Sequence, residues 1–397
     1  MSARLLVVLV AVAGVVGSVS AATPFIGHRG SVTLDAQGKA KYHDDVLDLN
    51  AAAFGSFDAA KNHKSGFGVL QIESNSEETG DRQYYAAGFL EGYLTHSEIY
   101  NHHINVLAVF SDLANGPSPE LKSYINNQTQ WIKKQLANNP SDRYWRQVGM
   151  ILQQYDGLMD GYNAAAPADK QLESFAFFIL NGCGDLFDLL PKYQTKQFPN
   201  FDNMTKPEFD LYRSQTGHCS ALVKLTGDFS QLFMAHSSWF RYQVTNRIYK
   251  HYNLKADVSA AQKISFSSYP GFLESLDDFY LMDSGLVMLQ TTNNVFNKDL
   301  QKYIHPETLL AWVRVRAATA LARDGEEWFD VVKRYNSGSY NNQYMVVDLN
   351  KFTPGQPLPD GTLWVGEQIP GLVEYADMTG QLAKGYWPSY NVPYFEK

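Results

Sequence analysis

The spacing of the apolar residues changes at Cys219, and this change constrains the fold more than any other feature of the chain. Before it, Trp145, Val148, Leu152 and Tyr155 recur at steps of three and four, the spacing of one buried helix face. After it, short runs rich in β-branched and apolar residues alternate with turns, as strands do. Strand runs bracketed by helical runs predict a layered α+β architecture rather than alternating βαβ units.

The chain therefore divides into a helix-rich part, residues 23–218, and a β-rich part, residues 219–397, of one overall fold. Helices are predicted at 84–107, from a Ser118 cap, from a Ser141 cap, at 171–190 with a break at 181–184, at 306–323 and at 325–335. Strands are predicted at 31–34, 39–42, 66–73, 219–225, 231–236, 263–267, 278–282, 286–292 and 344–348, with a hairpin turn at 283–285. Residues 191–217 are polar and rich in turn formers, and predict an exposed linker that ends beside Cys219.

The first 22 residues have the pattern of a secretory signal. Arg4 precedes an apolar run from Leu5 to Val16, and small residues follow at 18–22. The run is shorter than the roughly 20 residues that a membrane span needs. No other stretch is apolar enough to span a bilayer, so we expect a soluble protein, secreted or lysosomal, with no integral membrane segment after signal removal.

Composition excludes some classes of function. The 397 residues are 45% hydrophobic and 14% aromatic, which is ample for a large core. The formal net charge is −8 and no basic stripe is present, so a nucleic-acid partner is not expected. No G-x-S-x-G elbow and no glycine-rich phosphate loop occurs. Asp277 and Asp278 are adjacent on a predicted strand, so we expect them to face opposite ways, one of them toward water.

The chain has two cysteines, Cys183 and Cys219, which leaves open one disulfide or two buried thiols. No CxxC or HExxH spacing is present, so no metal site and no cofactor is expected. Two sequons, at Asn127 and Asn203, predict surface glycosylation in a secreted chain.

Cys219 stands at the junction between the predicted linker and a predicted strand. If the chain cuts itself between His218 and Cys219, the thiol and the new α-amine lie on one residue, as nucleophile and base together. An α-amine has a pKa of roughly 7.7–8.0, which suits proton transfer near neutral pH. Gly217 supplies backbone freedom next to the bond to be cut.

The surrounding sequence resembles the phospholipase B-like family over nearly all of residues 24–397. The motifs that carry the resemblance occur in order. They are Gly88–Thr95, Gly217–Lys224, Ala235–Trp239, Ser267–Gly271, Asp277–Tyr280, Ser284–Thr292, Tyr335–Gln343, Glu367–Gly371 and Tyr386–Phe395.

The resemblance implies an N-terminal nucleophile hydrolase with an αββα sandwich, matured by cleavage before Cys219, that removes fatty acyl groups from phospholipids. By motif position Cys219 is the nucleophile, His236 a polar active-site residue and Trp239 a wall of the substrate pocket. Thr292 and Asn391 are expected to line the site, with Asn391, and Asn341 as a weaker candidate, donating to the oxyanion. Family members continue beyond the Tyr394–Phe395 motif, so the sandwich is expected to be incomplete at its C-terminal end.

Two alternatives stay open at this point. The protein is an amidase that acts on N-acylated substrates, or it is a non-catalytic secreted or lysosomal glycoprotein that binds lipids or proteins. The structural alternatives for the site residues are a hydrogen-bonded structural His236, a hydrophobic-core role for Trp239, a strand-forming Thr292, and turn-forming roles for Asn391 and Asn341.

Overall fold

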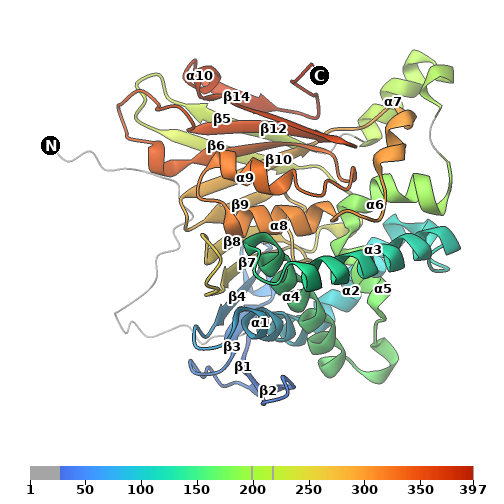
Figure 1. Ribbon diagram of the computed structural model, residues 1–397, viewed down its shortest axis with the longest axis vertical. Helices are drawn as coiled ribbons and strands as arrows, with labels where there is room; N and C mark the ends of the chain where they lie inside the picture. The colour runs from blue at the N-terminus through green and yellow to red at the C-terminus, as the bar shows by residue number, and fades with distance from the viewer. Residues whose placement is uncertain (1–26, 198–199, 217–218, 397) are drawn as a thin grey trace.

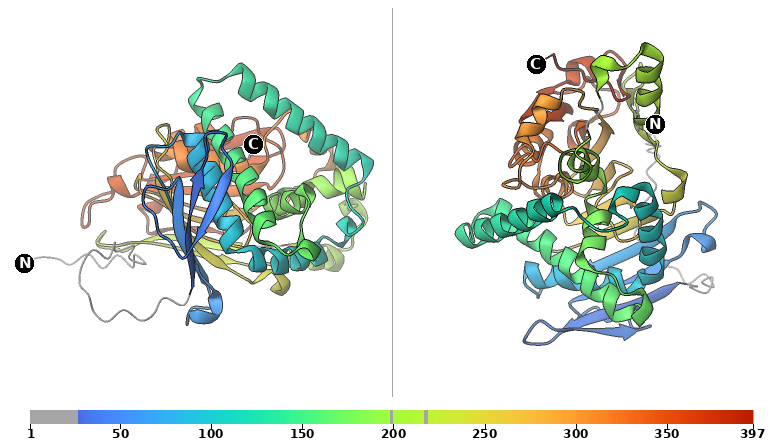
Figure 2. Two further views of the ribbon diagram at one scale, coloured as in Figure 1. Left: turned by 90° about the horizontal axis from the view of Figure 1, so that it is seen from below. Right: turned by 90° about the vertical axis from the view of Figure 1, so that its right-hand side faces the viewer.

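The computed structural model describes residues 27–197, 200–216 and 219–396, which form an α+β sandwich (Figure 1). The predicted α+β class is confirmed. The right-hand view of Figure 2 places β1–β3 at one end of the molecule and β12–β14 at the other. Within the described ranges, no helix has both the length and the apolarity needed to cross a bilayer.

A large sheet of eleven strands runs the length of the molecule in the order β13-β12-β11-β10-β9-β8-β7-β4-β3-β1-β2. Its strands are β1 (His28–Leu34), β2 (Ala40–Asp44), β3 (Ala53–Asp58), β4 (Gly68–Ser74), β7 (Ile248–Asn253), β8 (Lys263–Ser268), β9 (Phe279–Met282), β10 (Leu286–Thr292), β11 (Asn342–Asp348), β12 (Leu363–Ile369) and β13 (Leu372–Asp377). Neighbouring strands are antiparallel except β4 and β7, which pair in parallel with Gly68 opposite Ile248. The parallel pair joins strands from the two sides of Cys219.

A second sheet has the order β14-β5-β6, with β5 (Cys219–Leu225) between β14 (Tyr386–Ser389) and β6 (Leu232–Ser238). Cys219 is the first residue of β5 and lies opposite Ser238, and Ala221 lies opposite His236. The register therefore places His236 on the strand next to the cysteine, two residues further along.

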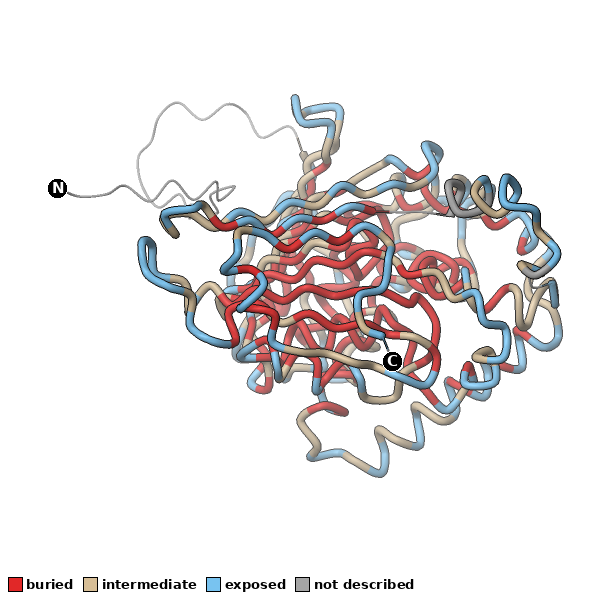
Figure 3. Tube along the Cα trace, turned by 90° about the horizontal axis from the view of Figure 1, so that it is seen from above, coloured by how far each residue is buried: buried red, intermediate tan, exposed pale blue. Residues whose placement is uncertain are grey.

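Alternation along the strands shows how the layers stack. In β11, Tyr344 and Val346 pack into the core under the helices, whereas Met345 and Val347 pack into a second core with Val223 of β5. A strand buried on both faces has no solvent side, which explains why all seven residues of β11 are buried. The buried trace follows these central strands (Figure 3).

Helices cover the face of the large sheet opposite the small sheet, with α1 (Gly80–Leu94) and α9 (Gly325–Val332) in direct contact with its strands. The other helices of the described residues are α2 (His96–Val109), α3 (Pro119–Asn138), α4 (Arg143–Ala165), α5 (Ser174–Asn181), α6 (Cys183–Leu189), α7 (Lys206–Thr216), α8 (Ala311–Leu321) and α10 (Thr379–Leu382), of which α10 is a single short turn beside β14. Helix α1 packs on β1, β3 and β4, and α9 packs on β11 and β12.

The predicted helix starts were right in one case and wrong in another. The Ser118 side chain accepts from the Leu121 amide at the start of α3, as expected. The predicted cap at Ser141 was wrong, because Asp142 caps α4 by accepting from the Trp145 amide. The prediction of a linker at 191–217 was wrong in part, because this segment contains α7. Pro207 lies in the first turn of α7, where proline is tolerated.

Helices α1 and α4 touch through their backbones at four glycines. An added Cβ at Gly88, Gly92, Gly157 or Gly161 would overlap a carbonyl oxygen of the facing helix. Steps of four residues place each pair of glycines on one face of its helix. The close approach of α1 and α4 therefore depends on the absence of side chains at these positions.

A buried ion pair ties α1 to β7. Lys250 Nζ lies 2.6 Å from Glu91 Oε1, and both side chains are fully buried. Lys250 also donates to the Phe272 carbonyl, and the Tyr252 hydroxyl donates to Glu91. Burial lowers the pKa of Lys250, and the Glu91 carboxylate opposes that shift.

We expect Lys250→Met to lower the free energy of unfolding by about 3–5 kcal/mol, because it leaves the Glu91 carboxylate buried without its cation. Chemical denaturation followed by fluorescence measures the loss. The double variant Lys250→Met with Glu91→Leu removes both charges and should recover most of the stability. A single variant within about 1 kcal/mol of the parent protein would contradict the expectation.

Candidate active site

The sulfur of Cys219 is buried where β5, β6, β10 and the loop before β9 meet. The residue is 5% exposed, and its backbone nitrogen donates to Asn391 Oδ1 at 3.1 Å. The sulfur lies 3.8 Å from Asp278 Oδ2, within hydrogen-bond distance for a thiol. A cavity of about 20 Å³, with room for about one water molecule, adjoins Cys219.

The expectation for the adjacent acids was wrong, because both Asp277 and Asp278 are buried. Asp278 does not belong to the strand, which begins at Phe279, and its φ of 61° is left-handed. Strand alternation therefore does not apply to it, and its carboxylate can turn toward Cys219. Asp277 pairs with Arg247 at 2.8 Å, away from the sulfur.

Several residues with a left-handed backbone conformation lie around Cys219. Seven non-glycine residues among those described have a positive φ, and three of them, Asp278, Tyr340 and Asn391, contact Cys219 or its carboxyl partner. Such conformations cost of order 1–3 kcal/mol each and persist where surrounding contacts hold them. This clustering marks the site, and it is a signal that strand and helix spacing cannot reveal.

His236 lies on β6 beside the sulfur. Its Nε2 is 2.8 Å from the Gln290 carbonyl oxygen, which can only accept, so Nε2 carries the hydrogen. Burial lowers the pKa of His236, although that same hydrogen bond opposes the shift, so the neutral ring is favoured. The structure thus brings the predicted His236 to the site and assigns its tautomer.

Trp239 and Thr292 line the small cavity at the sulfur, as the resemblance implies. The Trp239 residue is 61% exposed, so it lies at the rim rather than in the core. Burial and the neighbouring Asp278 raise the pKa of the Cys219 thiol, whereas the backbone amides of Trp239 and Thr292 lower it by favouring the thiolate.

Asn391 connects the cysteine nitrogen to β10. Its Oδ1 accepts from Cys219, and its Nδ2 donates to the Thr292 carbonyl at 2.6 Å. Reversing the amide would break both contacts, so the orientation is fixed. Asn391 therefore contacts the nitrogen that a cut would free. Its role as an oxyanion donor stays a prediction.

Asn341 lies in the turn before β11. Its amide donates to the Gly338 carbonyl at 3.0 Å and to Asp188 Oδ2 at 3.3 Å. No hydrogen bond joins Asn341 to Cys219 in the described part of the chain. The turn also presents the Tyr340 hydroxyl, which the sequence analysis did not select, to Asp278.

The ligand atoms of Cys219, His236 and Asp278 all lie within 4.8 Å of one another, a spacing that one metal ion can bridge. Metal ligands must be deprotonated. Here burial raises the pKa of both the thiol and the Asp278 carboxyl, and Tyr340 and Gln290 already bind that carboxyl. In this structure the carboxylate is thus held by two hydrogen-bond donors and lies within hydrogen-bond distance of the thiol.

The two cysteines are not bonded to each other. Both are free and buried, which excludes the disulfide alternative in this structure. Asn127 in α3 and Asn203 in the turn at Phe201–Asn203 are exposed, as glycosylation requires. His218 and the predicted signal, residues 1–22, lie outside the described residues.

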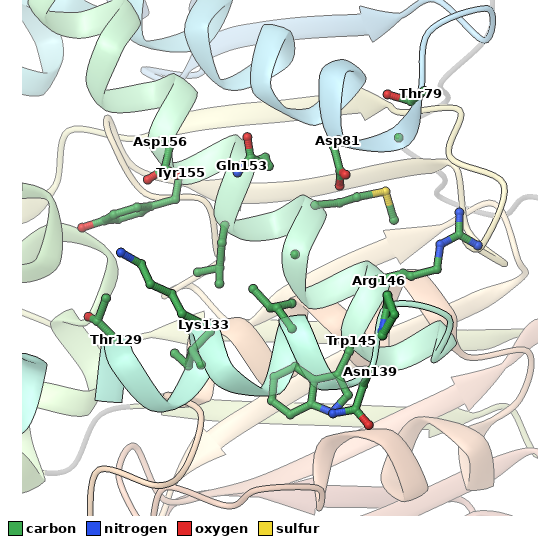
Figure 4. Close-up of a pocket in the computed structure, with 17 residues that line it drawn as sticks. Thr79, Asp81, Thr129, Lys133, Asn139, Trp145, Arg146, Gln153, Tyr155 and Asp156 are labelled. Carbon is green, nitrogen blue, oxygen red and sulfur yellow. The ribbon is translucent and has the colours of Figure 1, made fainter. Parts of the chain in front are cut away.

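Larger cavities lie elsewhere. The cavity between α3 and α4 has a volume of about 600 Å³, and Lys133, Asp156 and Trp145 are among the residues that line it (Figure 4). It contains no cysteine and no histidine and shares no lining residue with the Cys219 cavity. This cavity therefore offers neither a thiol nor an imidazole, and the Cys219 centre is the better candidate.

Fold and site together define an α+β sandwich protein with a buried thiol–carboxyl–imidazole centre at the start of a strand. The model of the family "Phospholipase B" matches residues 53–397. The chain belongs to the phospholipase B family, as its sequence motifs predicted.

Curated relatives support the same assignment. Phospholipase B-like 1 of Homo sapiens is 42% identical over 362 residues, 89% of this chain and 64% of the relative. Phospholipase B of Crotalus adamanteus is 42% identical over 88% of this chain and 64% of its own length. Phospholipase B-like protein B of Dictyostelium discoideum is 43% identical over 83% of this chain and 58% of its own length. The chain thus spans less than two thirds of the length of these relatives.

Proposed function

We propose that the protein is a cysteine acyl hydrolase of the N-terminal nucleophile type that releases fatty acids from phospholipids. One observation carries the proposal: the sulfur of Cys219, the first residue of β5, is buried against an acid while its own nitrogen is held by Asn391. A cut before Cys219 turns that nitrogen into an α-amine beside the thiol.

The catalytic cycle follows from these contacts. The α-amine takes the thiol proton, and the thiolate attacks the ester carbonyl carbon of the substrate to give a tetrahedral oxyanion. Collapse breaks the ester C–O bond; the departing oxygen takes the proton back from the ammonium group and leaves as the alcohol, and the acyl group stays on the sulfur. Water, activated by the same amine, then releases the fatty acid and restores the thiol. Asn391 holds the amine in line with the sulfur throughout.

The environment of the sulfur suits an acyl chain. Phe187, Trp239, Phe240 and Leu276 line the cavity with apolar surface. The cavity of about 20 Å³ is too small for a fatty acyl group, so entry of the substrate in this proposal follows the cut. The family name of the relatives favours a phospholipid over an N-acylated amide.

The same proposal places the protein in the secretory route. Residues 1–22 act as the signal, Asn127 and Asn203 carry glycans, and the mature protein is secreted or lysosomal. A glycosidase that lowers the apparent mass, and loss of that shift in the Asn127→Gln and Asn203→Gln variants, would test the glycans.

The decisive experiment follows the chain and the lipid together. Purified protein is incubated from acidic to neutral pH, separated under denaturing conditions, and sequenced from each N-terminus. We expect a new chain that begins Cys219–Ser220–Ala221–Leu222 and release of labelled fatty acid from phosphatidylcholine in mixed micelles. An N-acylethanolamine assayed in parallel tests the amidase alternative. A single intact chain that releases no acyl group would overturn the proposal and favour a non-catalytic binding protein.

A further inference from the structure

The cut itself needs a base, because the α-amine does not exist until the peptide bond is broken. Cys219 Sγ has one carboxylate within hydrogen-bond distance among the described residues, that of Asp278 at 3.8 Å. Asp278 is 0% exposed, has a left-handed backbone conformation and directly precedes β9. Nothing in the catalytic cycle of the mature enzyme uses this buried acid.

Two donors fix the carboxylate with one oxygen toward the sulfur. The Tyr340 hydroxyl lies 3.0 Å from Oδ1 and 3.1 Å from Oδ2, and Gln290 Nε2 donates to Oδ1. The oxygen nearer the sulfur is Oδ2. The Tyr340 backbone nitrogen is in turn held by Asp188 Oδ2 at 2.9 Å. The acid is therefore positioned from β10 and from the loop before β11.

His236 is the rival base. Its Nε2 hydrogen is committed to the Gln290 carbonyl, so only Nδ1 is left to accept a proton. A ring that took this proton would carry a charge in a buried place, which its lowered pKa disfavours. Asp278 needs no such charge, because accepting the proton neutralises it.

We propose that Asp278 takes the proton of the Cys219 thiol during self-cleavage and returns it to the Cys219 nitrogen. The proposal rests on the proposed function, since it explains how the N-terminal nucleophile arises. The thiolate attacks the carbonyl carbon of residue 218, and the bond from that carbon to the Cys219 nitrogen breaks. The nitrogen receives the proton from Asp278 and becomes the α-amine, and residue 218 is left as a thioester on the sulfur. Water then hydrolyses the thioester, which gives a carboxylate on residue 218 and a free thiol.

The charged and titratable groups around Asp278 set the direction of the pH dependence. They are Cys219 on β5, His236 on β6, Glu274 and Asp277 before β9, and Tyr340 before β11. Three further phenols lie nearby and stay neutral because the pKa of each is raised: Tyr269, Tyr280 and Tyr344. Burial raises the pKa of Asp278 well above its usual range, the Asp277 charge adds to the rise, and Tyr340 and Gln290 lower it.

Because the base must be ionised, the rate of the cut should increase as pH rises through the pKa of Asp278. The Tyr340→Phe variant removes a hydrogen bond that lowers this pKa, so the rising limb should move to higher pH. Burial raises the pKa of Asp188 to about 7, and Asp188 holds the Tyr340 backbone. The Asp188→Asn variant, which can still accept from that backbone, should leave the rising limb in place.

The main variant is Asp278→Asn, which keeps the shape of the side chain and suits left-handed backbone. Its rate of cleavage, followed by denaturing electrophoresis over the pH range, should fall at least about 100-fold. Glu274→Gln is the matched control: Glu274 is a second buried acid of the same loop, with no hydrogen bond to the sulfur among the described residues. Burial raises the pKa of Glu274 well above its usual range, so it is neutral as glutamine is, and the variant should be cut at the parent rate. Circular dichroism and thermal unfolding of each variant verify that the fold is kept, and the Tyr340→Phe profile remains informative if Asp278→Asn does not fold.

The outcomes separate the two proposals. If the parent chain is never cut, the proposed function fails and the role of Asp278 fails with it. If the parent is cut and Asp278→Asn is cut at the same rate, the role of Asp278 alone is overturned. A rising limb that Tyr340→Phe leaves in place, but that His236→Asn abolishes, would overturn it in favour of the histidine.

Discussion

Replacing Cys219 with alanine is expected to leave the protein as one chain and to reduce fatty acid release to the uncatalysed background. Cys219 is the only cysteine among the described residues whose sulfur lies within hydrogen-bond distance of the Asp278 carboxylate. Loss of the nucleophile removes both the cut and the acyl intermediate. Denaturing electrophoresis and a fatty acid release assay measure the two losses separately.

Cys183→Ala is the matched control for this prediction. Cys183 is also free and buried, but it lies in α6, where burial and the nearby Glu274 and Asp185 raise the pKa of its thiol; in the described part of the chain its sulfur has no hydrogen bond to a base. This variant should be cut and should turn over lipid like the parent protein. Cleavage that survives in Cys219→Ala, or that disappears in Cys183→Ala, would contradict the assignment of the nucleophile.

Replacing Gly157 with alanine is expected to lower the free energy of unfolding by about 3 kcal/mol, although alanine is the better helix former. An added Cβ would overlap the Tyr85 carbonyl oxygen and would lie 2.9 Å from the Phe89 nitrogen. Both are backbone atoms of α1, so neither can move aside as a side chain would. The two helices must separate, and contacts along their whole interface are lost. Chemical denaturation with unchanged helix content in the native state measures the effect.

Gly149 provides the control on the same helix. A Cβ there would meet the Leu136 Cδ2 atom at 3.3 Å, the end of a flexible side chain. Gly149→Ala should therefore be neutral or should stabilise the protein by up to about 1 kcal/mol through helix propensity. Equal effects of the two substitutions would show that the helix interface tolerates a methyl group, contrary to the close approach described.

The sequence predicted the helices and strands that bury one apolar face or consist almost entirely of apolar residues. The break of a helix at 181–184 is confirmed by α5 and α6, and the turn at 283–285 joins β9 to β10. Strand β7 was missed because Lys250 and His251 interrupt its apolar pattern, and the partner that makes a buried lysine tolerable, Glu91, lies far away in sequence. Such long-range pairing leaves no local signature.

The sequence predicted that Cys219 belongs to the candidate site, but it did not predict that Asp278 lies beside it. The structure brings Cys219, His236 and Trp239 close together, and their roles stay predictions. Asp278 was set aside because strand alternation was assumed for it, and only its left-handed φ reveals why the carboxylate turns inward. Tyr340, which donates a hydrogen bond to Asp278, belongs to the Tyr335–Gln343 motif, in which its neighbour Asn341 was the predicted site residue. In this turn, of two adjacent residues, it is Tyr340 rather than Asn341 whose side chain reaches Asp278.

The parallel pairing of β4 with β7 gives the proposed cut a lasting consequence. These strands come from opposite sides of residue 218, and six residue pairs from Gly68–Ile248 to Glu73–Asn253 join them within one sheet. The Lys250–Glu91 pair crosses the same junction. Two chains produced by the cut would stay together as one body. After denaturation, however, they would have to find each other again in solution, so refolding would change from a first-order to a concentration-dependent process. Cleavage would thus convert a protein that can refold alone into one whose persistence depends on never unfolding.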